Sequence, residues 1–461
     1  MNDTDLTRQL ADWASEQRFA DLADESVNQL QRLLIDHLAC AAGGAYLPWG
    51  RNLVHWAEPY AGSGESSLIG SRMRTSPPIA AFLNATAAHG MELDDTHDAS
   101  LSHPGAAVMA TALAVGADTN ANAEDILTAM AVGYEMTCRA GMATGASILE
   151  YGFHPTALFG GFGASAVAAH LYGLDRQGLE DAWGLLLSMI GGSAQFSQDP
   201  RGTVVKRLHG GFGAKNGILA AQLARQGLSG PARALDGRFG LLGLYGQGDS
   251  LPEKLDPNDG APLAIHRISL KPYPCCRLFH STIDAMREIL GELPYAGVDG
   301  IDEIHVGGPN VLPEQHMIRR PVSMMAAQYS LPYSIGAALE RGPYDISAFD
   351  EETLAHPVRE AIADKVFCVA DETMQAAFPD HFGTWIEFRF ADGSSKRVDK
   401  LDSYGTPSAP MSTADIVSKA DGLLKSTPID LSGDELAEAV SGFVSSGELL
   451  PLTGRLEGSS A

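Results

Sequence analysis

Hydrophobic residues recur at the three- to four-residue spacing of an amphipathic helix through most of the first half of the chain. The clearest such segment ends at Gly43-Gly44 and has these apolar positions: Val27, Leu30, Leu33, Leu34, Leu38 and Ala41. Further helices are predicted to begin where proline fits a first turn or where Asn or Asp can cap one, at Ser76-Pro77-Pro78, His103-Pro104, Asn122 and Asp175. Another is predicted from Gly213 to about Gln226, where Gly227 follows.

Strand signals begin after about residue 266. Residues 301–306 alternate as a strand does, and residues 385–390 and 395–398 flank the turn sequence Ala391-Asp392-Gly393-Ser394, which predicts a β-hairpin. Helices are predicted between these strands, at residues 324–339 and 351–368. The block is typical of a small α+β domain.

Amphipathic helices return near residues 413–424 and 433–444, the second with Ser432 as its N-cap. Residues 452–461 are interpreted as a loose tail. We therefore predict a mainly α fold. A large all-helical domain is built from both ends of the chain, residues 1–266 and 408–461, and a smaller α+β domain, residues 267–407, is inserted into it.

Charge narrows the range of partners. The formal net charge is −25 and no long run of Lys and Arg occurs, which argues against a nucleic-acid-binding protein. A polyanionic small molecule would need a local cationic pocket in this acidic chain. Hydrophobic residues make up 45% of the sequence, which is enough for a large core in two or more domains.

Cysteine usage and the N-terminus favour a cytoplasmic protein outside the membrane. The five cysteines form no CxxC pair, which argues against a zinc ribbon or an iron–sulfur site, and their odd number suits reduced thiols. The N-terminal residues are polar and acidic, unlike a signal peptide. The uncharged stretch from Thr156 to Gly173 contains four glycines, Ser165 and His170, so it is interpreted as a buried helix rather than a membrane span.

Two glycine-rich segments resemble nucleotide-binding loops but lack the required context. No strand precedes Gly161–Ala166, and Gly210–Lys215 does not have the spacing of a phosphate loop. Both are interpreted as sites of close helix packing.

The densest candidate chemistry lies between His89 and His103. This segment holds three histidines and four carboxylates in 15 positions at a predicted helix-to-loop junction. These residue types fit metal binding, general acid–base chemistry or a hydrogen-bonded loop without chemistry. The sequence alone leaves these three interpretations open.

Three further segments could complete a site. His154 is followed by Pro155, next to a predicted helix N-terminus, where a proton-transfer role competes with a structural one. Lys206-Arg207-Leu208-His209 and the segment from Lys271 to Arg277 are the most cationic stretches beside predicted helix starts, and such places bind carboxylates well. Tyr333 lies at the head of an apolar helix and could donate a hydrogen bond or simply be buried.

These segments together, in this order, resemble the MmgE/PrpD family. The most specific parts are Asp94-Asp95-Thr96 with His103-Pro104, then Gly152-Phe153-His154-Pro155, and then Lys206-Arg207-Leu208-His209. The resemblance implies a large helical domain with a smaller α+β lid, a homodimer, and no metal or organic cofactor.

The resemblance also implies site residues. Positions of the decarboxylase branch of the family fall on Glu92, Thr96, His103, His154, Lys206, Lys271 and Tyr333. The expected catalytic residues are His103, His154, Lys206, Lys271, Asp94 and Tyr333. The expected substrate-binding residues are Glu92, Asp95, Thr96, Arg207, His209 and Arg277. Two departures put decarboxylation in doubt: Glu92 stands where that branch has Asp, and the segment from Thr96 to His103 is one residue longer.

The expected chemistry is removal of a proton beside a carboxylate of a small di- or tricarboxylate. Lysines 206 and 271 would bind carboxylates, His103 and His154 would exchange protons, and Asp94 or Asp95 would orient an imidazole. A hydro-lyase like 2-methylcitrate dehydratase is the favoured interpretation. The alternatives are an epimerase of an imino- or aminodicarboxylate, a decarboxylase like that of cis-aconitate, and, least favoured, a non-catalytic carboxylate-binding protein.

Overall fold

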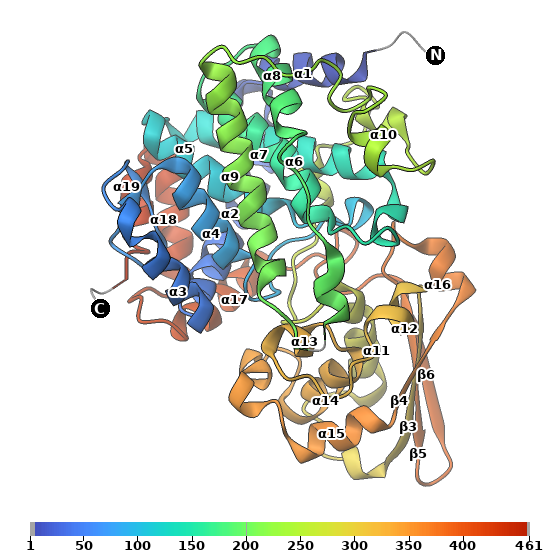
Figure 1. Cartoon of the computed structure of the whole chain (residues 1–461). Helices are drawn as coiled ribbons and strands as arrows, with labels where there is room; N and C mark the ends of the chain where they lie inside the picture. The colour runs from blue at the N-terminus through green and yellow to red at the C-terminus, as the bar shows by residue number, and fades with distance from the viewer. Residues whose placement is uncertain (1–4, 200, 459–461) are drawn as a thin grey trace. The chain divides into compact units, whose positions relative to one another are not determined.

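The computed structural model describes residues 5–199 and 201–458, which divide into two compact units (Figure 1). The larger, here called the helical unit, contains the chain up to Ser193, Arg207–Ile268 and the chain from Ser412 onward. The smaller unit contains Ala194–Lys206 and Ser269–Met411. The chain therefore passes between the units in its middle, within helix α9, as well as at both ends of the long insertion.

The helical unit is almost entirely α-helical. Its helices are α1 (Leu6–Glu16), α2 (Asp24–Ala45), α3 (Pro48–Ala57), α4 (Pro77–Ala88), α5 (Pro104–Thr119), α6 (Ala123–Thr144), α7 (Pro155–Leu171), α8 (Arg176–Leu186), most of α9 (Val205–Arg225), α10 (Leu241–Tyr245), α17 (Thr413–Lys425), α18 (Gly433–Ser446) and α19 (Leu449–Gly454). One short hairpin, β1 (Ser66–Ser67) with β2 (Arg74–Thr75), lies between α3 and α4. The helices α17 and α18 pack against α2, so helices from the first and the last parts of the sequence lie side by side in this unit. The predicted mainly α fold is confirmed.

The predicted helix caps are confirmed where a side chain can reach the first turn. Asn122 accepts a hydrogen bond from the amide of Asp125, and Asp175 accepts one from Gly178, each at 2.9 Å. Ser432 and Glu435 form a reciprocal capping box at the start of α18. These contacts are local in sequence, which explains why the pattern of residues alone could predict them.

The glycine-rich segments lie inside helices and allow close packing, as predicted. In α7, a Cβ on Gly163 would lie 2.0 Å from Oγ1 of Thr137 in α6. In α9, a Cβ on Gly211 would lie 2.3 Å from Oγ1 of Thr86 in α4. Any larger side chain at these positions would force the helices apart.

Two predicted helix boundaries were wrong for this same reason. Helix α9 begins at Val205 rather than Gly213, so the segment from Lys206 to His209 lies within the helix and not before it. Helix α2 continues through Gly43 and Gly44 to Ala45, and a Cβ on Gly44 would lie 2.0 Å from the carbonyl oxygen of Ala87. The sequence predicts a helix stop at Gly43-Gly44, but at Gly44 the close approach of a neighbouring helix requires glycine.

The smaller unit contains a four-stranded sheet in the order β4-β3-β5-β6 (Figure 1). Its strands are β3 (Ile301–Gly308), β4 (Val366–Ala370), β5 (Thr384–Phe390) and β6 (Ser395–Lys400). Its helices are α11 (His280–Leu290), α12 (Val311–Gln315), α13 (Met324–Gln328), α14 (Leu331–Arg341), α15 (Pro357–Asp364) and α16 (Glu372–Ala377). The predicted hairpin is the antiparallel β5–β6 pair, whereas β3 and β4 run parallel.

Three secondary-structure predictions in the second half of the chain were wrong. The helix predicted over 351–368 ends at Asp364, and the β-branched residues after it form β4. The helix predicted over 324–339 is interrupted where Ser330 caps a new helix and Pro332 occupies its first turn. The predicted loose tail includes the end of α19, and Leu452 and Leu456 are buried.

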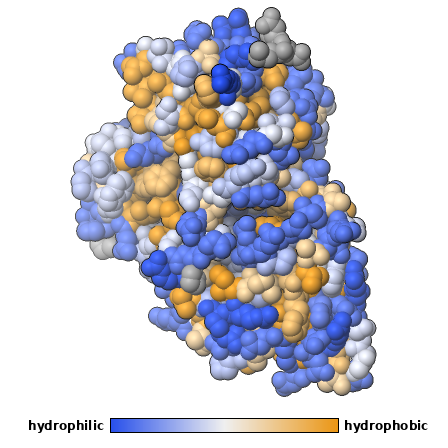
Figure 2. Space-filling view, turned by 45° about the vertical axis from the view of Figure 1, so that its right-hand side comes forward, coloured by the Kyte–Doolittle hydropathy of each residue, from blue (hydrophilic) through white to orange (hydrophobic). Residues whose placement is uncertain are grey.

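Among the described residues, no helix combines the length and apolar character that crossing a bilayer requires. The uncharged stretch from Thr156 to Gly173 forms most of α7, which is buried among α5, α6 and α8, as predicted. On the face shown in Figure 2, hydrophobic patches of the helical unit are bordered by hydrophilic residues.

Candidate active site

The segment from His89 to His103 connects the C-terminus of α4 to the N-terminus of α5. Although it has little regular structure, it is buried along most of its length, and His89 and Glu92 are at most 1% exposed. A polar segment at this depth needs internal partners because unpaired buried polar groups are costly. Its histidines and carboxylates are accordingly held by specific contacts, each described below.

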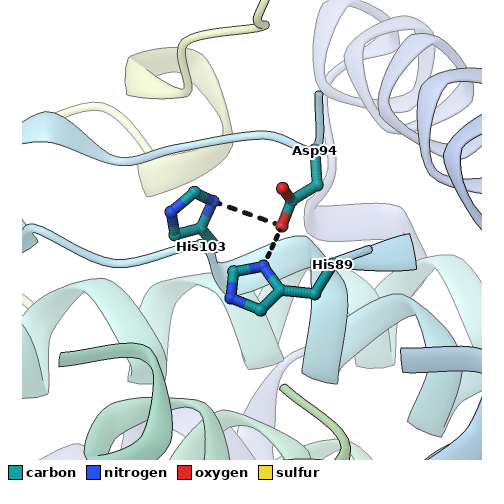
Figure 3. Close-up of side chains that lie close together, drawn as sticks. All are labelled: His89, Asp94 and His103. Atoms are coloured by element: carbon teal, nitrogen blue, oxygen red, sulfur yellow. Dashed lines mark hydrogen bonds and ion pairs between the residues drawn. The ribbon is translucent and has the colours of Figure 1, made fainter. Parts of the chain in front are cut away.

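Asp94 lies between two imidazoles (Figure 3). Its Oδ2 accepts a hydrogen bond from Nδ1 of His89 at 2.6 Å and lies 3.2 Å from Nδ1 of His103. Burial by itself would raise the pKa of Asp94, but the imidazoles of His103 and His89 lower it well below its usual value. The ionised carboxylate therefore favours a proton on Nδ1 of each ring, which leaves Nε2 of His103 as a basic atom.

Donor atoms of His89, Asp94 and His103 lie within 4.8 Å of one another, so these residues are also a possible set of metal ligands. Two ligand atoms on one zinc ion, each about 2.0–2.1 Å from it, would be about 3.3 Å apart in tetrahedral geometry. The 2.6 Å contact between His89 and Asp94 is much shorter than this. This spacing favours direct hydrogen bonding over shared coordination.

A second pair of histidines lies beside the first. His154 precedes α7 as its N-cap residue, and His209 lies in α9, with 2.9 Å between their Nδ1 atoms. The ring centroid of His154 is 6.4 Å from that of His103 and 5.9 Å from that of His89. We call these four residues (His89, His103, His154 and His209) the imidazole cluster.

Arg207 and Glu92, both predicted to bind substrate, contact each other. Nη1 of Arg207 forms a short ion pair with Oε1 of Glu92 and donates to the carbonyl oxygen of His89 at 3.3 Å. Glu92 has a φ of 53°, a left-handed conformation that is unusual for a residue other than glycine. The ion pair holds this turn of the chain directly against α9.

Asp95 supports the start of α5. Its Oδ1 accepts from the amide of Gly105 at 2.9 Å, and its Oδ2 accepts from the hydroxyl of Tyr134 at 2.5 Å. A Cβ on Gly105 would lie 2.5 Å from both Oδ2 of Asp95 and the Tyr134 hydroxyl, so this position has room only for glycine. Thr96, the next residue, donates to Asp98 at 3.1 Å.

Replacing Asp95 with asparagine should remove its contribution to the pH dependence of stability, so the variant should gain stability relative to the wild-type protein as the pH rises from about 4 to about 7. Burial raises the pKa of Asp95 to about 7, so between about pH 4 and pH 7 the folded protein retains a proton that the unfolded chain has lost. The contribution of Asp95 to the free energy of unfolding should therefore fall as the pH rises through this range, by on the order of 4 kcal/mol. Urea unfolding of both proteins at several pH values measures the difference.

Asp98→Asn is the matched control, because Asp98 is a half-buried carboxylate of the same loop. The control should retain the wild-type pH dependence. Equal slopes for the wild-type protein and the Asp95→Asn variant would contradict this assignment.

A buried ion pair that the sequence did not reveal supports the same loop. Nζ of Lys419, in α17, lies 2.6 Å from Oδ1 of Asp36, in α2, and 2.6 Å from the carbonyl oxygen of Leu93. Leu93 directly precedes Asp94, so a side chain near the end of the sequence fixes the backbone next to the central carboxylate. His89 belongs to the segment that the sequence singles out, but the sequence does not predict its contact with Asp94.

The remaining predicted site residues belong to the smaller unit. Lys206 and Lys271 are fully buried, and Nζ of Lys206 lies 5.1 Å from the ring centroid of Tyr329. Arg277 donates to Oγ of Ser403 at 2.7 Å. The hydroxyl of Tyr333 donates to the carbonyl oxygen of Ala348 at 2.6 Å and contacts Arg359. Lys206 directly precedes Arg207 in α9, so the boundary between the two units falls between these two residues.

Fold and site together define a class of protein: a helical body with a buried imidazole–carboxylate site, and a separate α+β unit that carries buried lysines. Two family models of one family together match most of the chain. The model of the MmgE/PrpD N-terminal domain matches residues 8–254, and that of the MmgE/PrpD C-terminal domain matches residues 273–432. The chain belongs to the MmgE/PrpD family, and the resemblance predicted from the sequence is confirmed.

Several similar proteins carry names that refer to one reaction. A cis-aconitate decarboxylase of Homo sapiens is 30% identical over 74% of this chain and 72% of its own length. A cis-aconitate decarboxylase of Aspergillus terreus is 28% identical over 85% of this chain and 83% of its own length. The cis-aconitate decarboxylase-like protein oryM of Aspergillus oryzae is 27% identical over 85% of this chain and 84% of its own length.

Proposed function

We propose that the protein is a lyase that removes a proton beside a carboxylate of a small di- or tricarboxylate, without a metal or organic cofactor. The observation that carries this proposal is the buried imidazole cluster, in which Asp94 contacts Nδ1 of both His89 and His103. Such an arrangement provides a base at Nε2 of His103. Family membership and the names of the relatives, which refer to a tricarboxylate, support the same substrate class.

In the proposed reaction, Nε2 of His103 takes the proton from the carbon, and its electron pair is delocalised into the adjacent carboxylate. Lys206 and Lys271 bind the substrate carboxylates and lower the cost of this extra negative charge. In dehydration, the electron pair then forms the carbon–carbon double bond while the β-hydroxyl leaves. His154 protonates that hydroxyl, so that water and an unsaturated acid are released.

The remaining predicted contacts extend this proposal. Thr96, Arg277 and Tyr333 are proposed to contact substrate, while Glu92 and Arg207 act as the ion pair described above. We further propose a homodimer in the cytoplasm, with no nucleic acid or membrane as partner. The acidic composition is the support for excluding nucleic acid.

Dehydration of a citrate-like acid remains the first proposal and decarboxylation is the second. The relatives' names favour decarboxylation, whereas Glu92 and the longer segment from Thr96 to His103 depart from that branch. Epimerisation is a third outcome, because two proton-transferring histidines could also serve opposite faces of one carbon.

Incubation in D₂O with citrate, 2-methylcitrate, cis-aconitate and a panel of other polycarboxylates should distinguish these reactions. Proton NMR would show a new vinyl signal without CO₂ release for dehydration, whereas released CO₂ would show decarboxylation. Deuterium at the carbon beside the carboxylate without net conversion would show epimerisation. If no acid in the panel exchanged a proton, the lyase proposal would fail and a non-catalytic carboxylate-binding protein would be favoured.

A further inference from the structure

We propose that His209 is a positioning residue that shares a proton with His154 and thereby makes His154 the general acid of the site. This inference rests on the proposed function, because it gives His154 the opposite role to His103. The two Nδ1 atoms are 2.9 Å apart, and the ring centroids are 5.0 Å apart. The sequence predicted that His209 binds substrate, and its contact with His154 suggests a different role.

A hydrogen bond between two Nδ1 atoms contains a single proton, so the two rings cannot choose their tautomers independently. When His209 donates, Nδ1 of His154 is the acceptor and Nε2 of His154 carries a proton that it can give away. When His154 donates, its Nε2 is left with a free electron pair. The state of His209 therefore determines whether His154 is an acid or a base at Nε2.

His103 has a different kind of partner. Its Nδ1 lies 3.2 Å from the Asp94 carboxylate, whose pKa is far below the neutral range, so this partner can only accept. An acceptor at Nδ1 keeps the proton there and leaves Nε2 of His103 unprotonated. The partner of His154 is an imidazole, which can both donate and accept. This difference assigns the base role to His103 and the acid role to His154.

The proton balance of the step follows from this pairing. Before the reaction, the His154–His209 pair holds one extra proton, and the positive charge is shared between the two rings. His154 then gives its Nε2 proton to the leaving hydroxyl, and water is formed. The pair becomes neutral, with Nδ1 of His154 donating to Nδ1 of His209 and Nε2 of His209 protonated. His103 has meanwhile gained the proton from carbon, so exchange with water restores both residues.

Packing around both rings keeps the pair in place. His209 is buried, and the amide of His154 donates to the carbonyl oxygen of Gly192 at 2.9 Å. A Cβ on Gly210 would lie 3.1 Å from Cβ of Ala106 in α5 and 3.6 Å from Cβ of His89. The α9 backbone is therefore pressed against α5 at the very residue after His209, which limits movement of its imidazole.

NMR of the wild-type protein labelled with ¹⁵N in its histidines tests the proposal without any substrate. The ring nitrogens of His154 and His209 should titrate together, and a His154→Gln variant identifies their signals. Ionisable groups of the same site include His89 and His103, whose ring centroids lie 5.9 and 6.4 Å from that of His154, together with Asp94 and the Glu92–Arg207 ion pair. Separate titrations of His154 and His209 in the wild-type protein would overturn the proposal.

The variant His209→Asn adds a kinetic test. Asparagine can still accept a hydrogen bond from Nδ1 of His154, but it cannot hold the extra proton. We expect kcat to fall by at least about tenfold, and by at most the roughly 10²–10⁴-fold that losing acid catalysis completely costs, while KM changes little. The alkaline limb of the pH profile should move to lower pH, because one ring now holds the proton alone.

His170→Asn is the matched control. His170 lies in the last turn of α7, the helix that His154 precedes, about 24 Å along the axis at 1.5 Å per residue. The His170→Asn variant should leave the pH profile and the His154 signals unchanged.

If His209→Asn leaves the His154 signals and the alkaline limb unchanged, His209 does not share the proton. Absence of turnover with every acid would instead contradict the proposed function, while the NMR result would still stand.

Discussion

Replacing Lys206 with methionine is expected to reduce kcat/KM by about 10²–10³-fold, the range found when one group that stabilises a developing negative charge is removed. Lys206 is fully buried, and its ammonium group lies over the ring of Tyr329. A charge in such surroundings interacts more strongly with a substrate carboxylate than it would in water. Methionine keeps most of the apolar stem, so the loss should be electrostatic rather than structural.

Lys215→Met provides the matched control, because Lys215 lies on the same helix with its ammonium group 5.9 Å from the ring centroid of Phe82. Initial rates on the substrate found in the D₂O panel measure the effect, and thermal unfolding checks that both variants are folded. The control should lose little activity. An unchanged kcat/KM in Lys206→Met would show that this lysine does not stabilise the substrate's charge.

Replacing His103 with glutamine is expected to reduce kcat by about 10²–10⁴-fold, because glutamine cannot accept the proton from carbon. The fold should tolerate the change. The backbone amide of His103 donates to Oγ1 of Thr156 at 3.1 Å, and this contact does not depend on the side chain. Deuterium incorporation beside the carboxylate is the most direct measurement, since it reports proton removal even when product formation is slow.

His97→Gln is the control for this variant, because His97 belongs to the same buried loop and bonds locally to Ser100 at 3.0 Å. Burial lowers the pKa of His97 to about 3, so this ring is neutral near pH 7 and glutamine removes no charge. If the His103→Gln variant incorporated deuterium at the wild-type rate, His103 would not be the base. Another histidine of the imidazole cluster would then have that role, with His154 as the next candidate.

Sequence patterns predicted the fold best where the determining contacts are local. The caps at Asn122, Asp175 and Ser432 involve residues three positions apart, and the β5–β6 hairpin has its turn sequence between its strands. The parallel strand β4 was missed because its pairing partner, β3, lies about 60 residues earlier and no local signal marks it. Gly43 and Gly44 were misread because their neighbours belong to other parts of the sequence.

In the candidate site, too, contacts between residues far apart in the sequence could not be predicted. The motif from His89 to His103 identified which residues could do chemistry, but it could not show which would pair. Arg207 contacts Glu92 across 115 positions of the chain, and Tyr134 contacts Asp95 across 39. Such pairings depend on how helices pack, so residues predicted as substrate contacts from the motif include some that contact each other.

The contact of Lys419 with Asp36 and with the Leu93 carbonyl has a consequence for biosynthesis. Asp36 leaves the ribosome almost 400 residues before its cationic partner, and an unpaired carboxylate is costly to bury. The final packing of the N-terminal helices around Asp36 is therefore expected to be completed only after α17 has been made. Chains that stall before α17 should lack an ordered loop at Asp94, and the enzyme becomes competent only after its last helices have been made.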